Sequence, residues 1–149
     1  MKQTIYLDTS IVSAYYDVRN PERQKLTREF WGKLKGYQIF TSALVLTEIG
    51  KLKDSTKKGK LLKLLEGAEE LPVNEECQRL ADEYLEKGII PIKYRDDAVH
   101  IAIAVVYSSD YLVSWNFEHI VKVKTRRMVG LVDAEKGYKP MEIIAPPEL

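Results

Sequence analysis

The chain has 149 residues, of which 45% are hydrophobic and 30% are charged, as expected for a globular protein with one hydrophobic core. Lys plus Arg number 23 and Asp plus Glu number 22, so the net charge of +1 excludes a strong overall attraction to nucleic acid and leaves only local patches. The single cysteine, Cys77, excludes an intrachain disulfide and is expected to be a small apolar filler.

Short runs of β formers alternate with helical segments in the first half of the chain. In chain order, the predicted elements are a strand at residues 4–7, a helix after residues 8–10, a helix at residues 20–36, a strand at residues 37–41, and helices at residues 42–52 and 57–66. Asn20 before Pro21 and Ser42 before an apolar run are typical helix starts. Gly36 is a typical helix stop.

The second half continues the alternation. Its predicted elements are an extended piece at residues 71–73, a helix at residues 74–88, a loop at residues 89–92, an apolar helix at residues 95–107, a strand at residues 111–115, a helix that begins within residues 117–127 and a strand at residues 141–145. Strands that alternate with helices predict an α/β fold, in which a parallel sheet lies between two layers of helices. Ligands bind beyond the carboxyl ends of the strands in such sheets.

Four polar side chains are predicted to converge at that edge of the sheet. Asp8 follows the first strand, and Asn116 follows the strand that ends at Trp115. Asp97 lies in the first turn of the apolar helix, and Glu48 lies about two turns into the helix after the second strand. Glu48 and Asp97 also interrupt apolar stretches, where a charge is costly unless it is paired or bound to a metal.

This combination of side chains predicts a divalent-metal site. Three carboxylates in one place repel one another, which raises the pKa of at least one of them, and a divalent cation removes that conflict. Carboxylates, an amide and waters suit Mg²⁺ or Mn²⁺, whereas zinc favours His and Cys. The matching chemistry is hydrolysis of a phosphodiester bond by a metal-activated water.

Each residue also has a simpler interpretation. Asp8 could act only as an N-cap, and Asn116 could act only as a turn residue. Glu48 could be a solvated helix residue, and Asp97 could be a carboxylate that interacts with the helix dipole. Asp96 could have that same dipole role or could support the site. The joint fit of the four residues to one sheet edge favours the metal site.

Several neighbouring residues are candidates for supporting roles. His100 lies one turn after Asp97 and shares its helix face, and His119 lies in the segment after the strand at residues 111–115. His100 could be an ordinary hydrogen-bonded core histidine, and His119 could be exposed or support the site. Either could instead contact phosphate or orient a ligand. Thr9 and Ser10 could cap a helix or bond to a metal-bound water.

Two basic clusters are visible in the sequence. The first is typical of a solvated helix face and comprises Lys51, Lys53, Lys57, Lys58, Lys60 and Lys63. The second follows the Asn116 segment, could contact phosphate, and comprises Lys122, Lys124, Arg126 and Arg127. If the second cluster contacts RNA, the affinity should fall steeply with salt.

Four segments occur in a characteristic order: residues 5–11 (IYLDTSI), 47–49 (TEI), 95–102 (RDDAVHIA) and 110–120 (DYLVSWNFEHI). They resemble the ordered motifs of the PIN-domain family, and more narrowly those of the toxins of VapBC-type toxin–antitoxin pairs. The resemblance implies a five-stranded parallel sheet and an Mg²⁺- or Mn²⁺-dependent endoribonuclease whose acidic metal-site residues are Asp8, Glu48 and Asp97. It also implies a homodimer, and a small antitoxin that fills the cleft with a basic side chain.

The sequence departs from the family pattern at Asn116, where many members carry Asp. An amide binds metal more weakly than a carboxylate and cannot act as a base. We therefore predict strong binding of Mn²⁺ at one site and little binding at a second.

Two other functions are open at this point. One is a non-catalytic module of the same fold that binds RNA or a protein through a weakened metal site. The other is phosphoryl transfer through an aspartyl-phosphate on Asp8, although Ser10 stands where the common Asp-x-Asp pattern has its second aspartate.

The sequence gives no sign of export or membrane insertion. Residues 1–3 lead directly into a strand-like run, without the apolar region and cleavage site of a signal peptide. The longest mainly apolar stretch, residues 98–107, is shorter than the roughly 20 residues that span a bilayer. No repeat or linker divides the chain. We therefore expect a cytoplasmic protein with one domain over residues 1–149.

Overall fold

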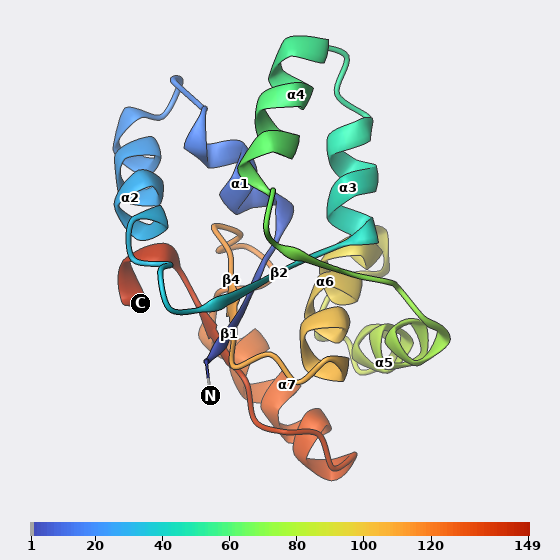
Figure 1. The fold of residues 1–149 in the computed structure, drawn as a ribbon. Coiled ribbons are helices and arrows are strands. Elements are labelled where there is room, and N and C mark those ends of the chain that lie inside the picture. The colour runs from blue at the N-terminus through green and yellow to red at the C-terminus, as the bar shows by residue number, and fades with distance from the viewer. Residues whose placement is uncertain (1) are drawn as a thin grey trace.

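The computed structural model describes residues 2–149 and has a five-stranded parallel sheet at its centre (Figure 1). The strands are β1 (Thr4–Leu7), β2 (Gln38–Ser42), β3 (Glu69–Leu71), β4 (Tyr111–Val113) and β5 (Glu142–Ile144). Their order in the sheet is β3-β2-β1-β4-β5, and every neighbouring pair is parallel. The predicted parallel α/β fold is confirmed.

Helices cover both faces of the sheet. The α-helices are α1 (Thr9–Tyr15), α2 (Pro21–Trp31), α3 (Ala43–Gly50), α4 (Ser55–Leu64), α5 (Glu75–Glu86), α6 (Arg95–Val106) and α7 (Val123–Glu135). Two short 3-10 helices are η1 (Ile92–Tyr94) and η2 (Pro146–Glu148). Since crossovers between parallel strands are right-handed, the connections toward β3 place α1 to α4 on one face, and the connections toward β5 place α5 to α7 on the other. Figure 1 shows α2 and α4 on the opposite side of the sheet from α5 and α7.

Side chains identified in the sequence begin three of these helices. The side chains of Asn20, Ser42 and Asn74 accept hydrogen bonds from backbone N–H groups in the first turns of α2, α3 and α5. Each bond satisfies a donor that has no partner within the helix. The predicted starts of these helices are confirmed.

The end of the second helix differs from the prediction. This helix ends at Trp31 and not at residue 36, because a turn at residues 32–37 leads into β2. The helix predicted to begin within residues 117–127 begins at Val123, inside the predicted range. The side chain of Asn116 accepts a hydrogen bond from the backbone N–H of His119, and this local bond forms a turn ahead of that helix.

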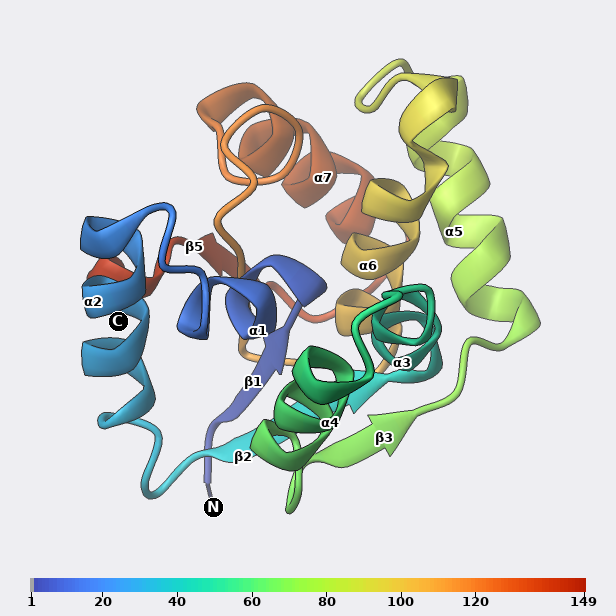
Figure 2. The ribbon, with the colours of Figure 1, turned by 90° about the horizontal axis from the view of Figure 1, so that it is seen from above.

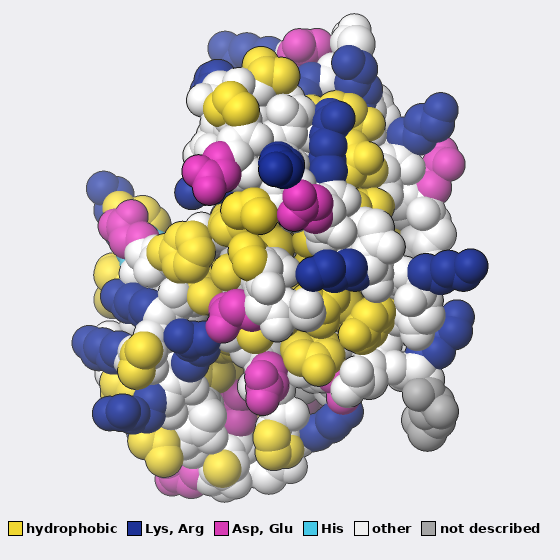
Figure 3. All heavy atoms as spheres, turned by 90° about the vertical axis from the view of Figure 1, so that its left-hand side faces the viewer, with side chains coloured by type: hydrophobic (Ala, Val, Ile, Leu, Met, Phe, Trp, Pro, Cys, Tyr) yellow, Lys and Arg dark blue, Asp and Glu magenta, His cyan; other side chains and the backbone are white. Residues whose placement is uncertain are grey.

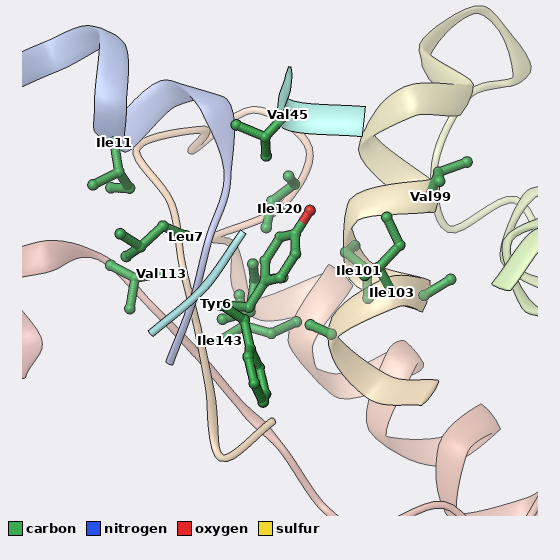
Figure 4. Close-up of a cluster of buried hydrophobic side chains, with 14 of the residues drawn as sticks. Tyr6, Leu7, Ile11, Val45, Val99, Ile101, Ile103, Val113, Ile120 and Ile143 are labelled. Atoms are coloured by element: carbon green, nitrogen blue, oxygen red, sulfur yellow. The ribbon is translucent and has the colours of Figure 1, made fainter. Parts of the chain in front are cut away.

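The core lies on both sides of β1 and contains mainly aliphatic side chains. All three residues Ile5, Tyr6 and Leu7 are fully buried, as is typical of a central strand in a parallel sheet. Figure 4 shows the Tyr6 ring among these aliphatic side chains, with its hydroxyl as the polar atom of the cluster. Cys77 is buried and free, as expected for an apolar filler.

The surface is mixed in character. Figure 3 shows Lys and Arg side chains interspersed with acidic and hydrophobic ones over the face of the molecule that it presents. Within residues 2–149, no helix combines the length and apolar character needed to cross a membrane.

The strand register brings the residues that follow β1, β2 and β4 to one edge of the sheet. Leu7 pairs with Val113, and Tyr6 pairs with Phe40. Asp8, Ser42 and Ser114 therefore lie at neighbouring positions at the carboxyl ends of their strands.

Candidate functional site

Asp8 lies at the carboxyl end of β1, with only 3% of its surface exposed. It occupies the N-cap position of α1, but its side chain makes no capping bond. Its two carboxylate oxygens instead accept hydrogen bonds from the hydroxyls of Ser10 and Ser114, each at 2.5 Å. An N-cap role therefore does not account for this buried carboxylate, and two hydroxyls fix its orientation.

Glu48 projects from α3, and one of its carboxylate oxygens meets two donors. Its Oε1 atom accepts a hydrogen bond from the Thr9 hydroxyl at 2.5 Å and lies 2.7 Å from Nε2 of His100. Because an ionised carboxylate only accepts hydrogen bonds, Nε2–H of His100 is the donor. Nδ1 of the same ring lies 2.8 Å from the hydroxyl of Tyr6, which also lies 2.8 Å from Oγ of Ser42. Hydrogen bonds through His100 and Tyr6 thus connect Glu48 to the central strand β1.

Asp97 lies in the first turn of α6 and contacts the segment that follows β4. Its Oδ2 atom lies 2.9 Å from Nδ1 of His119. The ring of Tyr94 packs on the His119 imidazole, with 4.1 Å between ring centroids. Figure 2 shows the segment before α6 and the segment after β4 on the same side of the sheet, in agreement with these contacts.

The hydrogen bonds leave one oxygen free on each of two carboxylates. Within the described part of the chain, Oε2 of Glu48 and Oδ1 of Asp97 accept no hydrogen bond, whereas the other oxygen of each group is held. Both residues are partly exposed, with 26% and 22% of their side chains accessible. Each carboxylate is thus oriented by the protein and still offers an oxygen to a ligand.

Asn116 connects Ser114, which bonds to Asp8, with His119, which bonds to Asp97. Its backbone N–H donates to Oγ of Ser114 at 2.9 Å, and its side-chain oxygen accepts from the backbone N–H of His119 at 2.9 Å. The turn interpretation of Asn116 is confirmed. A carbonyl oxygen has two lone pairs, so this role leaves a second interaction open to the same atom.

The charges of all three carboxylates act on His100. Burial alone would lower the pKa of His100, but the hydrogen bond to Glu48 and the surrounding negative charge outweigh burial and raise it. The carboxylates that exert this charge are Asp8, Glu48 and Asp97. Of these three acids, Glu48 contacts the imidazole directly, while Asp8 and Asp97 act on it through their charge.

The pKa values of two of these acids shift in opposite directions. Burial raises the pKa of Asp8 despite the charge of His100 and the hydrogen bonds from two serine hydroxyls. Burial would also raise the pKa of Glu48, but the hydrogen bond and charge of His100, with the bond from Thr9, lower it overall. Glu48 is therefore the better-compensated charge, and Asp8 is the one that a nearby cation would help most.

The donor atoms of the site fit Mg²⁺ or Mn²⁺ in type. They are hard carboxylate oxygens, while both nitrogens of His100 and Nδ1 of His119 are engaged with carboxylates and a hydroxyl. Within residues 2–149, no three side chains of His, Cys, Asp or Glu are placed so that together they could hold a metal ion. An ion that binds through one or two carboxylates and keeps several waters, as Mg²⁺ commonly does, suits such an open arrangement.

The remaining candidates lie in different surroundings. Asp96 is exposed and borders a separate pocket beside Thr47 and Val99. Lys122 precedes α7, and the other three basic candidates lie on the first turns of α7: Lys124, Arg126 and Arg127. The guanidinium of Arg126 reaches the backbone oxygen of Ile143 and lies 3.8 Å from Glu148, so it anchors the C-terminal segment.

Three residues of the site escaped the sequence analysis. Ser114 holds Asp8, Tyr6 supports His100, and Tyr94 packs on His119. Tyr6 could have been identified from the sequence, because a hydroxyl in a fully buried strand needs a hydrogen-bond partner. The other two depend on contacts between segments that are far apart in the sequence.

Comparison with known proteins gives a family and a fold. The family model of the PIN domain matches residues 5–121. No curated protein matches the chain. The fold is similar to that of several solved structures whose sequence identity to this chain is low. At such identity the comparison shows only that the folds are alike.

Three of these structures cover nearly the whole chain. VapBC-1 from nontypeable Haemophilus influenzae has 16% identity and a TM-score of 0.62, with 97% of this chain and 99% of that chain covered. VapBC2 from Rickettsia felis, bound to a DNA fragment from its promoter, has 16% identity and a TM-score of 0.60, with 96% and 98% covered. VapC20 from Mycobacterium tuberculosis, a toxin that cleaves the Sarcin-Ricin loop, has 15% identity and a TM-score of 0.60, with 92% and 98% covered.

Proposed function

Because the chain belongs to the PIN-domain family, whose model matches residues 5–121, we propose that it is a divalent-metal-dependent endoribonuclease. The observation that carries the proposal is that hydroxyls and imidazoles at the carboxyl edge of the sheet orient the carboxylates of Asp8, Glu48 and Asp97. Glu48 and Asp97 are each held through one oxygen, and the other oxygen accepts no hydrogen bond within the described residues. This is the arrangement expected of residues that bind a cation beside a phosphate.

The residues that would hold the ion are Asp8, Glu48 and Asp97, with Asn116 as a weaker oxygen ligand. A bound Mg²⁺ or Mn²⁺ supplies a water of lowered pKa and offsets the charge that develops on the phosphate. His100 and His119 orient Glu48 and Asp97 through their N–H groups, and Ser10 and Ser114 orient Asp8. Lys122, Lys124 and Arg127 are the nearby cations that we assign to the RNA backbone.

We further propose that the enzyme is the toxin of a toxin–antitoxin pair and acts in the cytoplasm as a homodimer. The support is the likeness of fold to structures of VapBC complexes and of VapC20. A short open reading frame for an antitoxin beside the gene, and co-purification of its product, are the expected observations. A gene with no such neighbour would count against this part of the proposal and not against the nuclease.

The test of the nuclease is Mn²⁺-dependent cleavage of single-stranded RNA by the purified chain. Asp8→Asn and Asp97→Asn should each slow cleavage by roughly a hundredfold or more, because a metal supplies several kcal/mol of transition-state stabilisation. Glu86→Gln, an exposed acid on α5, is the matched control and should cut like the parent. If both aspartate variants cut as fast as the parent, the proposal is wrong.

The same experiment separates the two other functions. A chain that binds Mn²⁺ but cuts no RNA would be the non-catalytic module. An aspartyl-phosphate mechanism is disfavoured because Asp8 is only 3% exposed and both of its carboxylate oxygens accept hydrogen bonds from serine hydroxyls. Failure to trap a beryllium fluoride adduct on Asp8 is the expected result.

A further inference from the structure

Two exposed aromatic rings flank the candidate metal centre. Phe117 is 51% exposed and Tyr94 is 38% exposed. Phe117 follows Asn116 directly, and Tyr94 lies in η1, immediately before α6 and three residues before Asp97. The two rings therefore border the site from the two segments that carry its outer residues.

Each ring is coupled to the site through one contact. Tyr94 packs on the imidazole of His119, which bonds to Asp97. Phe117 lies against Trp115, with 6.1 Å between ring centroids, and the backbone N–H of Trp115 donates to the Ser10 hydroxyl at 2.9 Å. The rings are thus fixed to the site and still open to solvent.

Three lysines without an ion pair lie near the rings, one in space and two in the sequence. Nζ of Lys93 lies 5.7 Å from the centre of the Tyr94 ring. Lys122 and Lys124 follow within seven residues of Phe117. Within the described residues 2–149, none of these three lysines makes an ion pair. Aromatic rings interleaved with free lysines are the chemistry of a surface that binds single-stranded nucleic acid, in which bases stack and phosphates meet cations.

We infer that Tyr94 and Phe117 form a stacking platform for unpaired bases of the RNA next to the bond that is cut. This inference rests on the proposed function, from which it takes RNA as the substrate. It adds a surface that recognises the RNA and a preference for unpaired bases. Bases inside an RNA duplex are already stacked on one another, so the platform favours single-stranded loops and ends over paired regions. Two other exposed apolar side chains, Ile92 and Val123, lie near the rings in the sequence. The lysines next to them, Lys93, Lys122 and Lys124, add positive charge to this surface and favour RNA over a protein partner.

The test measures RNA binding apart from cleavage. The probe is a 12-nucleotide single-stranded RNA with one 2-aminopurine, titrated with the full chain in EDTA so that the proposed reaction cannot run. Phe117→Ala and Tyr94→Ala should each raise the dissociation constant roughly five- to a hundredfold, the range for loss of one stacked base. Phe117→Trp should restore the affinity, and binding to the parent should change the 2-aminopurine fluorescence.

Two controls distinguish stacking from loss of structure. Leu131→Ala removes another exposed apolar side chain, 67% accessible on α7, and should leave RNA binding unchanged. An abasic nucleotide at the stacked position should weaken binding to the parent but not weaken binding to Phe117→Ala any further. Thermal unfolding of all variants should stay near that of the parent.

Different experimental results would contradict the inference and the proposed function. If Phe117→Ala and Tyr94→Ala bind RNA like the parent, or if the parent binds no single-stranded RNA, the platform does not exist and the rings serve another partner, such as a protein. If RNA binding depends on the rings but Mn²⁺-dependent cleavage is absent, the platform stands and the nuclease assignment falls.

Discussion

Each of the three acidic residues is positioned by a hydrogen bond from a neutral hydroxyl or an imidazole. His119 holds Asp97 at 2.9 Å, and His100 holds Glu48 at 2.7 Å. Groups that orient metal ligands in this way commonly affect metal affinity as strongly as a weak ligand does. The histidines are therefore expected to matter although neither need touch the ion.

Substitution of His119 tests this positioning. His119→Phe keeps a ring beneath Tyr94 but removes the hydrogen bond to Asp97, so the Mn²⁺ dissociation constant should rise roughly ten- to a hundredfold. Glu118→Gln is the control, because Glu118 is exposed and lies 3.6 Å from His119 without contacting Asp97. Calorimetry with the metal alone measures the effect. Equal affinities for His119→Phe and the parent would show that His119 is only structural.

The amide at position 116 sets the expected number of metals. Its oxygen already accepts a backbone N–H and is uncharged, so it is a poor second ligand. Asn116→Asp keeps that hydrogen bond and adds a charge, and a second binding event for Mn²⁺ should appear in calorimetry. Two tight and similar events in the parent chain would contradict the prediction.

The residues of the site were more readily predicted than their partners. Asp8, Glu48 and Asp97 could be proposed from local sequence, because Asp8 follows a strand, Asp97 begins a helix and Glu48 interrupts an apolar helical stretch. Ser114 could not be found as a partner of Asp8, because the two residues are 106 positions apart and meet only through the register of β1 and β4.

At the scale of elements, helix starts were predicted well, and the end of the second helix was placed too late. A capping side chain and its N–H donor are three residues apart, so the signal is local. The turn at residues 117–122 is also built by a local bond, from His119 to Asn116, but asparagine forms both turns and caps, and the sequence does not distinguish them. The consequence for the site is large, because this turn carries His119 and Phe117.

The packing of α7 against α5 contains a buried carboxylate that should make stability depend on pH. Asp133 is 3% exposed and accepts a hydrogen bond from the Tyr84 hydroxyl at 2.6 Å. Burial raises the pKa of Asp133 from 3.8 to about 6, against the effect of that bond. The folded state therefore favours the protonated form. The contribution of the protonated Asp133 carboxyl to stability is complete below about pH 4 and is lost as the pH rises through about 6.

Asp133→Asn removes this dependence. The variant keeps an oxygen that can accept from Tyr84 but carries no charge at any pH. Above pH 6 its free energy of unfolding should exceed that of the parent by up to about 3 kcal/mol, since one pKa unit corresponds to about 1.4 kcal/mol. Urea unfolding at pH 4 and pH 8 measures the difference, which should vanish at pH 4. A difference that is the same at both values would show that Asp133 does not titrate in this range.

At the scale of the whole molecule, the near-neutral charge limits how RNA is bound. With a net charge of +1, attraction must come from a few local cations, and we assign Lys122, Lys124 and Arg127 to this role. About three phosphate contacts on a single strand predict a dissociation constant that rises roughly fifteenfold between 50 and 200 mM salt. Replacement of the three residues by Ala should flatten this response. A flat response in the parent would rule out the contact.

The fold as a whole was predictable because the alternation of strands and helices is a repeated signal. Local sequence did not predict the order of the strands or the place of β1 between β2 and β4. Both depend on which strands pair. That pairing is also what brings the residues after β1 and β4 together. The site is therefore a product of the sheet's topology.

A crystal of the chain soaked in Mn²⁺ and measured for anomalous scattering tests the central claim most directly. The claim is that Asp8, Glu48 and Asp97 bind one divalent cation at the carboxyl edge of the sheet. We predict one strong anomalous peak among these three side chains, and its loss in Asp97→Asn. A strong peak elsewhere with none at this edge, or a site that stays empty at millimolar Mn²⁺, would contradict the account.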